Sequence, residues 1–376
     1  MIKTAYYQDL TKMNTFGMKV KARCFMEYDS VADLVDIEFE ELARPVLHIG
    51  GGSNLLFTDD FKGTILHSKI NFIEILDECH FERVEKSQET VLVSVGAGVV
   101  FDDFCDWAAK EGLWGVENLS YIPGEVGASA VQNIGAYGVE VKDVIRKVYC
   151  YDTVEEEFVN FDVEDCEYGY RDSVFKDPEI KGRYIVTHVV FALYRTPQPK
   201  LDYAHLKEMV LSSSNVISSE DEDRAEKSLT PAQIRKAIIR IRKEKLPEPS
   251  VMGSAGSFFK NPVISVEHFE RIVAAAKAEY GQDYKVPHYI VECHSVTETP
   301  ACSETMIKVP AAWMIEQCGW KGKRSGGAAV WEKQPLVIVN YTGEAYPEEI
   351  IGLEKRIIAS VKTKFGVELH PEVEHI

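Results

Sequence analysis

The sequence contains no long hydrophobic run and no excess of basic residues. None of its 376 residues lies in an apolar stretch near the roughly 20 residues that a transmembrane helix needs. The first nine residues, Met1 to Asp9, lack the apolar core of a signal peptide, so we expect a cytoplasmic protein. The formal net charge is −18, whereas proteins that track nucleic acid carry a basic face. We therefore expect neither membrane nor nucleic-acid partners.

The chain also lacks paired cysteines and several common catalytic motifs. Its eight cysteines form no CxxC pair and stand at positions 24, 79, 105, 150, 166, 293, 302 and 318. Their scatter favours free thiols in a reducing compartment over disulfides or zinc, and we expect no metal. P-loop, HExxH and GxSxG motifs are absent. Function must therefore be sought in other patterns.

What is present is typical of a globular protein with two domains. Hydrophobic residues make up 45% of the chain and charged residues 27%. Alternation and apolar runs predict strands over 46–49, 64–67, 91–95, 144–151 and 184–193, and helical spacing predicts a helix over 101–110. Residues 1–200 thus read as an α+β domain with glycine-rich connections.

The second part of the chain begins after a polar break. Residues 212–228 are rich in serine and acidic residues, which predicts a solvated insertion. Thr230 as N-cap, Pro231 at the first helical position and Gln233 three residues after the cap predict the start of a helix. Beyond it we expect helices near 266–280, 310–318 and 347–364 and a strand near 328–340.

Two glycine-rich stretches are candidates for binding a phosphate-bearing ligand. The first, Gly50-Gly51-Gly52-Ser53-Asn54, follows a predicted strand, and its backbone amides could hold a phosphate or simply form a tight turn. The second runs from Ile122 to Gly138 and combines small residues, side-chain amides and an aromatic ring. Its low apolar content argues against a core helix and favours cofactor binding. Gly96-Ala97-Gly98-Val99-Val100-Phe101 mimics a dinucleotide fingerprint, but its sixth residue is Phe, so we interpret it as a turn.

These stretches together resemble the FAD-binding fold of the vanillyl-alcohol-oxidase type. More narrowly, the chain resembles the MurB family, the UDP-N-acetylenolpyruvoylglucosamine reductases, with matching motifs from Asn14-Thr15-Phe16-Gly17 to Pro371-Glu372-Val373. The resemblance implies an α+β protein with a two-lobed FAD-binding domain over residues 1–200 (lobes about 1–74 and 75–200). A connecting segment at 201–244 and a substrate-binding domain at 245–376 would follow.

The resemblance also implies which residues contact non-covalently bound FAD. They belong to the two glycine-rich stretches: Gly50, Gly51, Gly52, Ser53, Asn54, Ile122, Pro123, Gly124, Gly127, Ala128, Gln132, Asn133, Gly135, Ala136, Tyr137 and Gly138.

Three further residues match the family's catalytic positions. Arg171, in Tyr168-Gly169-Tyr170-Arg171, corresponds to the arginine that holds the substrate carboxylate. Ser257, in Gly256-Ser257-Phe258-Phe259-Lys260-Asn261-Pro262, corresponds to the proton donor, and Glu372 to the glutamate near the C-terminus. The substrate-binding positions that match are Tyr170, Tyr203, Lys245, Asn261 and Gln317.

The reaction implied is reduction of an enol ether that bears a carboxylate, with NADPH as hydride donor to the flavin. Charge that develops on the substrate needs a cation, which suits Arg171. The α-carbon needs a proton, which suits Ser257. Two alternatives stay open at this point: another FAD-dependent oxidoreductase of the same fold, such as an alcohol or sugar oxidase, and a nucleotide-sugar binding protein without chemistry.

Overall fold

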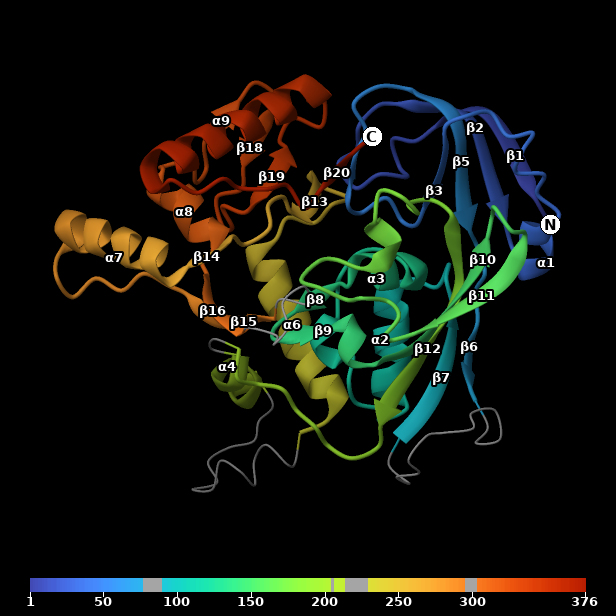
Figure 1. Ribbon diagram of the computed structural model, residues 1–376, viewed down its shortest axis with the longest axis horizontal. Helices are drawn as coiled ribbons and strands as arrows, with labels where there is room; N and C mark the ends of the chain where they lie inside the picture. The colour runs from blue at the N-terminus through green and yellow to red at the C-terminus, as the bar shows by residue number, and fades with distance from the viewer. Residues whose placement is uncertain (77–89, 204–205, 214–228, 295–302) are drawn as a thin grey trace. The chain divides into compact units, whose positions relative to one another are not determined.

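The computed structural model describes residues 1–76, 90–203, 206–213, 229–294 and 303–376 (Figure 1). Its Cα positions fall into two compact units. The first contains Met1–Met13, Val20–Ser53 and Asp60–Glu244, and the second contains Asn14–Lys19, Asn54–Asp59 and Lys245–Ile376. Two short N-terminal segments thus belong to the C-terminal unit, and residues 201–244 belong to the first.

A four-stranded sheet opens the first unit, in the order β1-β2-β5-β3. Its strands are β1 (Lys3–Asp9), β2 (Lys21–Tyr28), β5 (Phe61–Ser68) and β3 (Val46–Ile49). β5 runs parallel to β2 and β3, and residues 63–68 of β5 are buried throughout. Central parallel strands are covered on both faces, which explains the continuous burial of residues 63–68, including the polar side chains of Thr64, His67 and Ser68. The short helix α1 (Val31–Val35) is capped by Ser30, whose hydroxyl accepts from the Asp33 amide.

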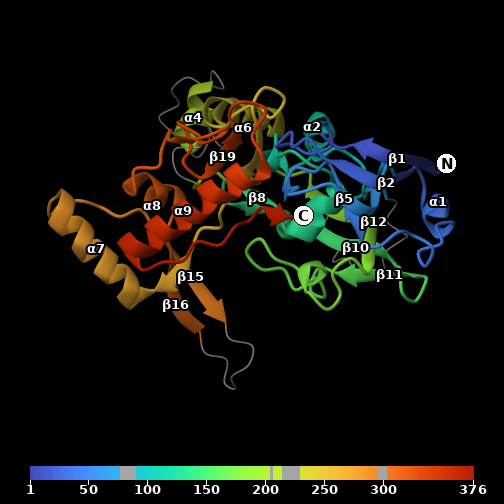
Figure 2. The same ribbon diagram turned by 90° about the horizontal axis from the view of Figure 1, so that it is seen from above.

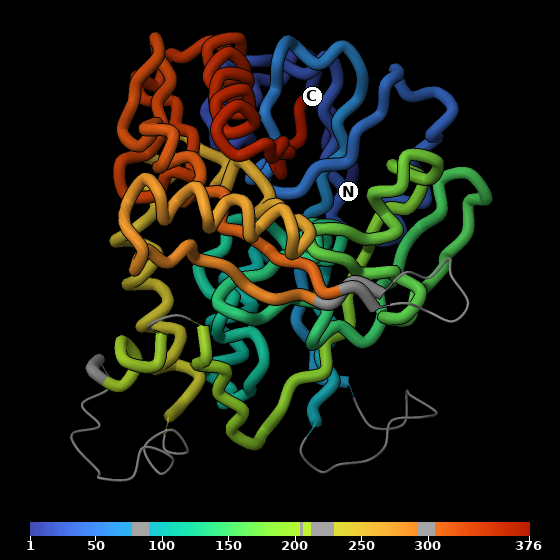
Figure 3. The backbone as a smooth tube through the Cα atoms, turned by 60° about the vertical axis from the view of Figure 1, so that its left-hand side comes forward, coloured from blue at the N-terminus to red at the C-terminus, as the bar shows by residue number. Residues whose placement is uncertain are grey.

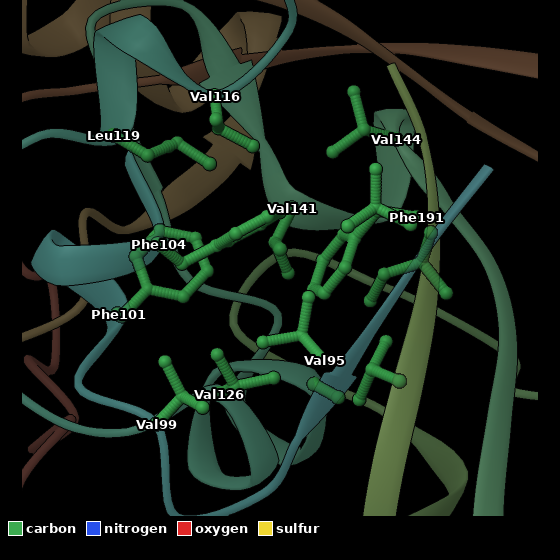
Figure 4. Close-up of a cluster of buried hydrophobic side chains, with 14 of the residues drawn as sticks. Val95, Val99, Phe101, Phe104, Val116, Leu119, Val126, Val141, Val144 and Phe191 are labelled. Atoms are coloured by element: carbon green, nitrogen blue, oxygen red, sulfur yellow. The ribbon is translucent and has the colours of Figure 1, made fainter. Parts of the chain in front are cut away.

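The second sheet of this unit is antiparallel and has the order β11-β10-β12-β7-β6. It comprises β11 (Glu157–Asp162), β10 (Ile145–Asp152), β12 (Tyr184–Tyr194), β7 (Thr90–Gly96) and β6 (Ile73–Ile75). Helix α2 (Phe101–Lys110) and helix α3 (Val126–Gln132) contribute side chains to the core beside this sheet (Figure 4). The rings of Phe104 in α2 and Phe191 in β12 lie 4.7 Å apart. Helix and sheet therefore share one apolar core.

The remaining elements of the first unit surround a smaller core. They are the hairpin β8 (Gly135–Ala136) and β9 (Val139–Glu140), α4 (Leu206–Ser213) and α6 (Pro231–Lys245). α6 begins as predicted, because the Gln233 amide donates to Thr230 Oγ1 at 3.3 Å and the Thr230 amide donates to Gln233 Oε1 at 2.8 Å. Its apolar face, including Ile234, Ile238 and Ile241, packs on Trp114 and its neighbours.

Within the described residues, the second unit contains small sheets and three helices (Figure 2). One sheet has the order β13-β19-β18-β17, another β14-β16-β15, and β20 pairs in parallel with β4. The strands are β13 (Gly253–Ser257), β19 (Val337–Asn340), β18 (Ala328–Val330), β17 (Arg324–Ser325), β14 (Val263–Ser265), β16 (Ser303–Lys308), β15 (Tyr289–His294), β20 (Glu374–His375) and β4 (Leu55–Leu56). The helices are α7 (Val266–Tyr280), α8 (Ala311–Gln317) and α9 (Pro347–Phe365).

The structure confirms the predicted strands and helices of the first 200 residues and the three predicted C-terminal helices. Two predictions are wrong. The single strand expected near 328–340 is two strands joined by a turn, and the second glycine-rich stretch does contain a buried helix, α3. Gly96-Ala97-Gly98 ends a strand in a turn, as predicted. Most of the 212–228 insertion lies outside the described residues.

Among the residues that the structure describes, five cysteines are free thiols, and burial raises the pKa of Cys105 and Cys150. Cys79 and Cys302 lie outside those residues, and the side chain of Cys293 is not described. None of the helices in the described ranges is both long and apolar enough to cross a membrane.

Candidate functional site

The two glycine-rich stretches meet in the first unit. A Cβ built on Gly51 would lie 3.5 Å from Gly124 Cα, and one built on Gly124 would lie 2.9 Å from Ser53 Oγ. Ser53 Oγ donates to the Pro123 carbonyl at 3.1 Å. Gly124 has a φ of +121°, which side chains rarely adopt. Two turns that are 70 residues apart in the sequence therefore lie backbone against backbone.

Helix α3 follows directly after the second turn and is built for close packing. A Cβ on Gly127 would lie 2.9 Å from the Ala97 Cβ, so this position needs glycine because of the protein's own turn at 96–98. The buried face of α3 thus contains the small residues Gly127, Ser129 and Ala130, where other helices have large apolar side chains. This explains why the sequence pattern missed the helix.

Asn133 ends α3 and holds the neighbouring loops together. It is fully buried with a φ of 43°, and its Nδ2 donates to the Gly169 carbonyl at 2.7 Å and to Glu140 Oε2 at 3.1 Å. Its Oδ1 accepts from the Lys142 amide at 3.2 Å. The side-chain amide of this predicted FAD residue is therefore engaged with protein groups at both ends.

Arg171 lies against the same loop. Its guanidinium donates to the Gly135 carbonyl at 2.5 Å and to the Asn133 carbonyl at 3.3 Å, and it lies 5.6 Å from the centre of the Tyr170 ring. Arg171 has a φ of 56°, in the left-handed region. The structure thus brings together two predicted segments, Tyr168 to Arg171 and Gln132 to Gly138, and two backbone carbonyls orient the arginine.

Tyr137 and Tyr203 form an aromatic pair beside this loop. Their rings are 5.9 Å apart and nearly perpendicular, and the Tyr203 side chain is 40% exposed. Arg242 of α6, which the sequence analysis missed, donates to the Tyr121 carbonyl at 3.0 Å and interacts with Tyr137. Burial lowers the pKa of Arg242, and burial raises the pKa of Tyr137. A guanidinium that is partly shielded from water therefore interacts with Tyr137, whose ring packs against the predicted substrate-binding residue Tyr203.

In the second unit, the Ser257 and Glu372 segments lie side by side. The Glu372 amide donates to the Phe258 carbonyl at 2.8 Å, and the Lys260 amide donates to the His370 carbonyl at 2.9 Å. Phe259 and Pro371 form a bridge between the two segments. Both Ser257 and Glu372 are half-buried. Two predicted catalytic residues that are 115 positions apart are thus held on paired backbones.

The C-terminal segment follows the end of α9 (Figure 3) and is held by hydrogen bonds within the same unit. Asn54 Nδ2 donates to the Glu372 carbonyl at 3.1 Å, and the Ile376 carbonyl accepts from the amide and hydroxyl of Thr58 at 2.8 and 2.7 Å. His375 Nε2 lies 3.2 Å from Oε2 of Glu354, a buried carboxylate of α9. These contacts fix the stretch that carries Glu372. Asn54, predicted to contact FAD, contributes here to the anchor.

The predicted substrate-binding residues of the second unit lie on other elements than Ser257 and Glu372. Lys245 is exposed at the end of α6, and its carbonyl accepts from Trp331 Nε1. Asn261 Oδ1 accepts from the Ala311 amide at 2.9 Å and so caps α8. Gln317 ends α8, where its carbonyl accepts from Lys364. A cavity of about 450 Å³ between α7, α8 and the end of α9 contains none of the predicted site residues.

Arg171 lies in the first unit, whereas Ser257 and Glu372 lie in the second. Comparison with known proteins identifies the family to which the chain is similar. A family model described as UDP-N-acetylenolpyruvoylglucosamine reductase, C-terminal domain, matches residues 248–376, and a model described as FAD binding domain matches residues 23–158. The UDP-N-acetylenolpyruvoylglucosamine reductase of Bacteroides fragilis is 47% identical over 368 residues, which cover 98% of each chain.

The chain belongs to the UDP-N-acetylenolpyruvoylglucosamine reductase family. The reductase of Porphyromonas gingivalis is 42% identical over 98% of this chain and 97% of its own. The crystal structure of the MurB reductase from Thermus caldophilus matches with a TM-score of 0.59 at 20% identity, covering 100% of this chain and 98% of that one, and shows a shared fold. The predicted fold class, an α+β FAD-binding domain followed by a second α+β domain, is confirmed.

Family membership includes an FAD-binding domain, and the first unit has features that fit the cofactor. The two facing turns present glycines where any side chain would fill the space between them, as at Gly51 and Gly124. Backbone that can be approached so closely is what a diphosphate requires. In this reductase family member FAD would therefore be held by the turns at 50–53 and 122–124.

One charged cluster beside these turns corresponds to no sequence motif. His67 in β5 lies between Glu125 and Glu27, with ring nitrogens 2.9 and 3.1 Å from their carboxylate oxygens. The three residues are separated by up to 98 positions in the sequence, and each stands alone in its local pattern. The sequence indicates this cluster only through Glu125, a charged residue that directly follows the glycine-rich turn.

Proposed function

We propose that this protein is an NADPH-dependent flavoenzyme that reduces the enolpyruvyl group of UDP-N-acetylglucosamine enolpyruvate to UDP-N-acetylmuramate. It would act in the bacterial cytoplasm, in the synthesis of peptidoglycan precursors. The observation that carries the proposal is the pairing of the Ser257 and Glu372 backbones in a chain 47% identical to a reductase of this name. We also propose the domain limits given above: FAD binding over 1–200, a connection over 201–244 and substrate binding over 245–376.

FAD, when bound, supplies the hydride, and NADPH restores it. The protein's own task is to stabilise charge that grows on the substrate carboxylate and to deliver a proton to the α-carbon. We assign the first task to Arg171, whose guanidinium is already oriented by two backbone carbonyls. A cation fixed in this way needs little reorganisation when the charge appears.

We assign the proton to Ser257. Gly256, with a φ of 69° and open space where a Cβ would stand, gives the strand end the freedom to present the hydroxyl. Glu372, fixed on the neighbouring backbone, would hydrogen-bond a carboxylate oxygen or orient a water. The position of the acid is thus defined by main-chain contacts on both sides.

Binding of the UDP-sugar is assigned to residues away from the reacting carbons. Lys245 and Asn261 would face the diphosphate, Tyr170 and Gln317 would contact the substrate, and Tyr203 would cover it. The exposure of Tyr203 and its pairing with Tyr137 support a covering role.

The purified protein tests the proposal directly. It should be yellow, NADPH should bleach the flavin band anaerobically, and UDP-N-acetylglucosamine enolpyruvate should restore it. Restoration by oxygen alone at high rate would instead support an oxidase of the same fold. A colourless protein that binds the UDP-sugar without turnover would support a binding protein.

A further inference from the structure

His67 is placed so that both of its ring nitrogens face carboxylates. Nε2 lies 2.9 Å from Glu125 Oε1, and Nδ1 lies 3.1 Å from Glu27 Oε1. A neutral imidazole has a single N–H, so it can donate to only one of the two carboxylates. Burial opposes the charged form, but the contacts with Glu125 and Glu27 outweigh it and raise the pKa of His67. Both contacts can therefore be hydrogen bonds only when His67 is protonated on both ring nitrogens, as an imidazolium.

The two carboxylates differ in their access to water. The Glu125 side chain is 8% exposed and that of Glu27 is 27% exposed. Glu27 can turn toward solvent if His67 loses its proton, whereas Glu125 stays buried. An isolated buried carboxylate is strongly disfavoured, so Glu125 depends on His67 for its charge balance.

Glu125 is also in contact with the turns that would hold FAD. It follows Gly124 directly, and a Cβ on Gly50 would lie 3.3 Å from Glu125 Oε2. A negative charge immediately behind a loop that binds a diphosphate repels the ligand unless a cation compensates it. His67 is in contact with that charge.

We propose that His67 is a positioning residue for FAD, which neutralises Glu125 behind the two glycine turns and thereby sets how tightly the protein retains its cofactor. The proposal rests on the placement of FAD at these turns. It predicts opposite effects on FAD binding for the two residues. Loss of the His67 imidazolium exposes the diphosphate to an uncompensated carboxylate, whereas loss of the Glu125 carboxylate removes the repulsion.

Other charged groups lie around His67. Lys69, which directly follows β5, opposes the charge of His67. His48 on β3 does not compete for that charge, because burial and the charge of His67 lower its own pKa to about 3. Tyr28 on β2 lies 2.7 Å from His48 Nε2, and its hydroxyl is coupled to Glu125. Of the two histidines, His67 is the one whose pKa is raised from 6.5. Its positive charge is therefore lost as the pH rises through that raised pKa.

The test is the dissociation constant of FAD from the holoenzyme, measured by flavin fluorescence on dilution. At pH 7, His67→Gln should weaken FAD retention about 10-fold or more, because one unit charge within about 10 Å of another has this effect at an effective dielectric constant of about 20. Glu125→Gln should retain FAD as tightly as the wild type or more tightly. The double variant should return to within about 3-fold of the wild type.

The pH profile provides a readout that a packing role would not change. Wild-type retention should weaken as the pH rises through the raised pKa of His67, and the profiles of both single variants should be flat there. His188→Gln is the matched control: His188 is a half-buried histidine of the first unit, and its ring stacks on Tyr149 with the ring centres 4.2 Å apart. Its pH profile should follow that of the wild type.

Two results would overturn the proposal: equal weakening by His67→Gln and Glu125→Gln, or a pH profile that persists in His67→Gln. Gly124→Ala separates this failure from a wrong placement of FAD, because its Cβ would enter the space between the turns. Unchanged FAD retention in Gly124→Ala would refute the placement. Weakened retention in Gly124→Ala, with none in His67→Gln, would refute the role of His67 alone.

Discussion

Replacing His375 by alanine tests how the C-terminal segment positions Glu372. The change leaves the buried Glu354 carboxylate without the imidazole that lies 3.2 Å from it. Leaving a buried polar group without its partner costs about 1–3 kcal/mol, but the His375 side chain is 33% exposed, so water can replace part of the contact. We expect a loss of about 2 kcal/mol in the free energy of unfolding.

The same change should affect catalysis through geometry. His375 lies in β20, three residues after Glu372, and its ring is 6.2 Å from that of Phe258, which follows Ser257. A shift of about 1 Å in a catalytic group can cost about 100-fold in rate. We therefore expect reoxidation of the flavin by the enolpyruvyl substrate to slow about 10-fold, with FAD content unchanged.

Urea denaturation and rapid-mixing absorbance measure the two effects. His370→Ala is the control, because His370 lies in the same segment with an exposed side chain. It should alter neither quantity. A His375→Ala variant as stable and as fast as His370→Ala would refute the anchoring role of the Glu354–His375 contact.

Three further predictions concern other contacts. Asn133→Ala should lower flavin content after gel filtration, because the bonds to Gly169 and Glu140 that shape the loop are lost; full flavin content would contradict this. Lys245→Ala should raise KM more than it lowers kcat, since a remote diphosphate contact is similar in ground and transition states; a pure kcat defect would place Lys245 elsewhere. Arg183→Gln should destabilise the protein at pH 7, because burial is outweighed by Arg183 together with the amides of Val154 and Glu155, which lower the pKa of Asp152. Since this stabilisation is lost as the pH falls through the lowered pKa, below 3.8, the difference in stability should vanish there; a constant difference would refute it.

The sequence predicted most regular elements because their signals are local. Helix α6 begins at the Thr230–Gln233 capping box, and β3 and β7 are short apolar runs that end at glycines. Helix α3 was missed because it is buried through small residues, so that its fit to Ala97 depends on shape and leaves no apolar period. Such packing is visible only in three dimensions.

Site residues that belong to contiguous sequence motifs could be predicted from the sequence. The glycine turns, Ser257 and Glu372 were found in this way, and the structure shows which backbones hold them. The structural contacts of the Asn54 and Asn261 side chains could not be predicted. Their partners, Glu372 and Ala311, are distant in the sequence. The pairs His67–Glu125 and Glu354–His375 were missed for the same reason.

The most direct test of the proposed reaction is rapid-mixing absorbance of Ser257→Ala at the flavin band. Proton delivery to the α-carbon is needed only when the enolpyruvyl substrate is reduced, and not when NADPH reduces FAD. The variant should therefore bleach with NADPH at close to the wild-type rate, whereas its reoxidation by substrate slows about 10²–10⁴-fold, and Ser257→Cys should recover part of the rate. Equal slowing of both half-reactions, or of neither, would contradict the assignment of Ser257 as the proton donor.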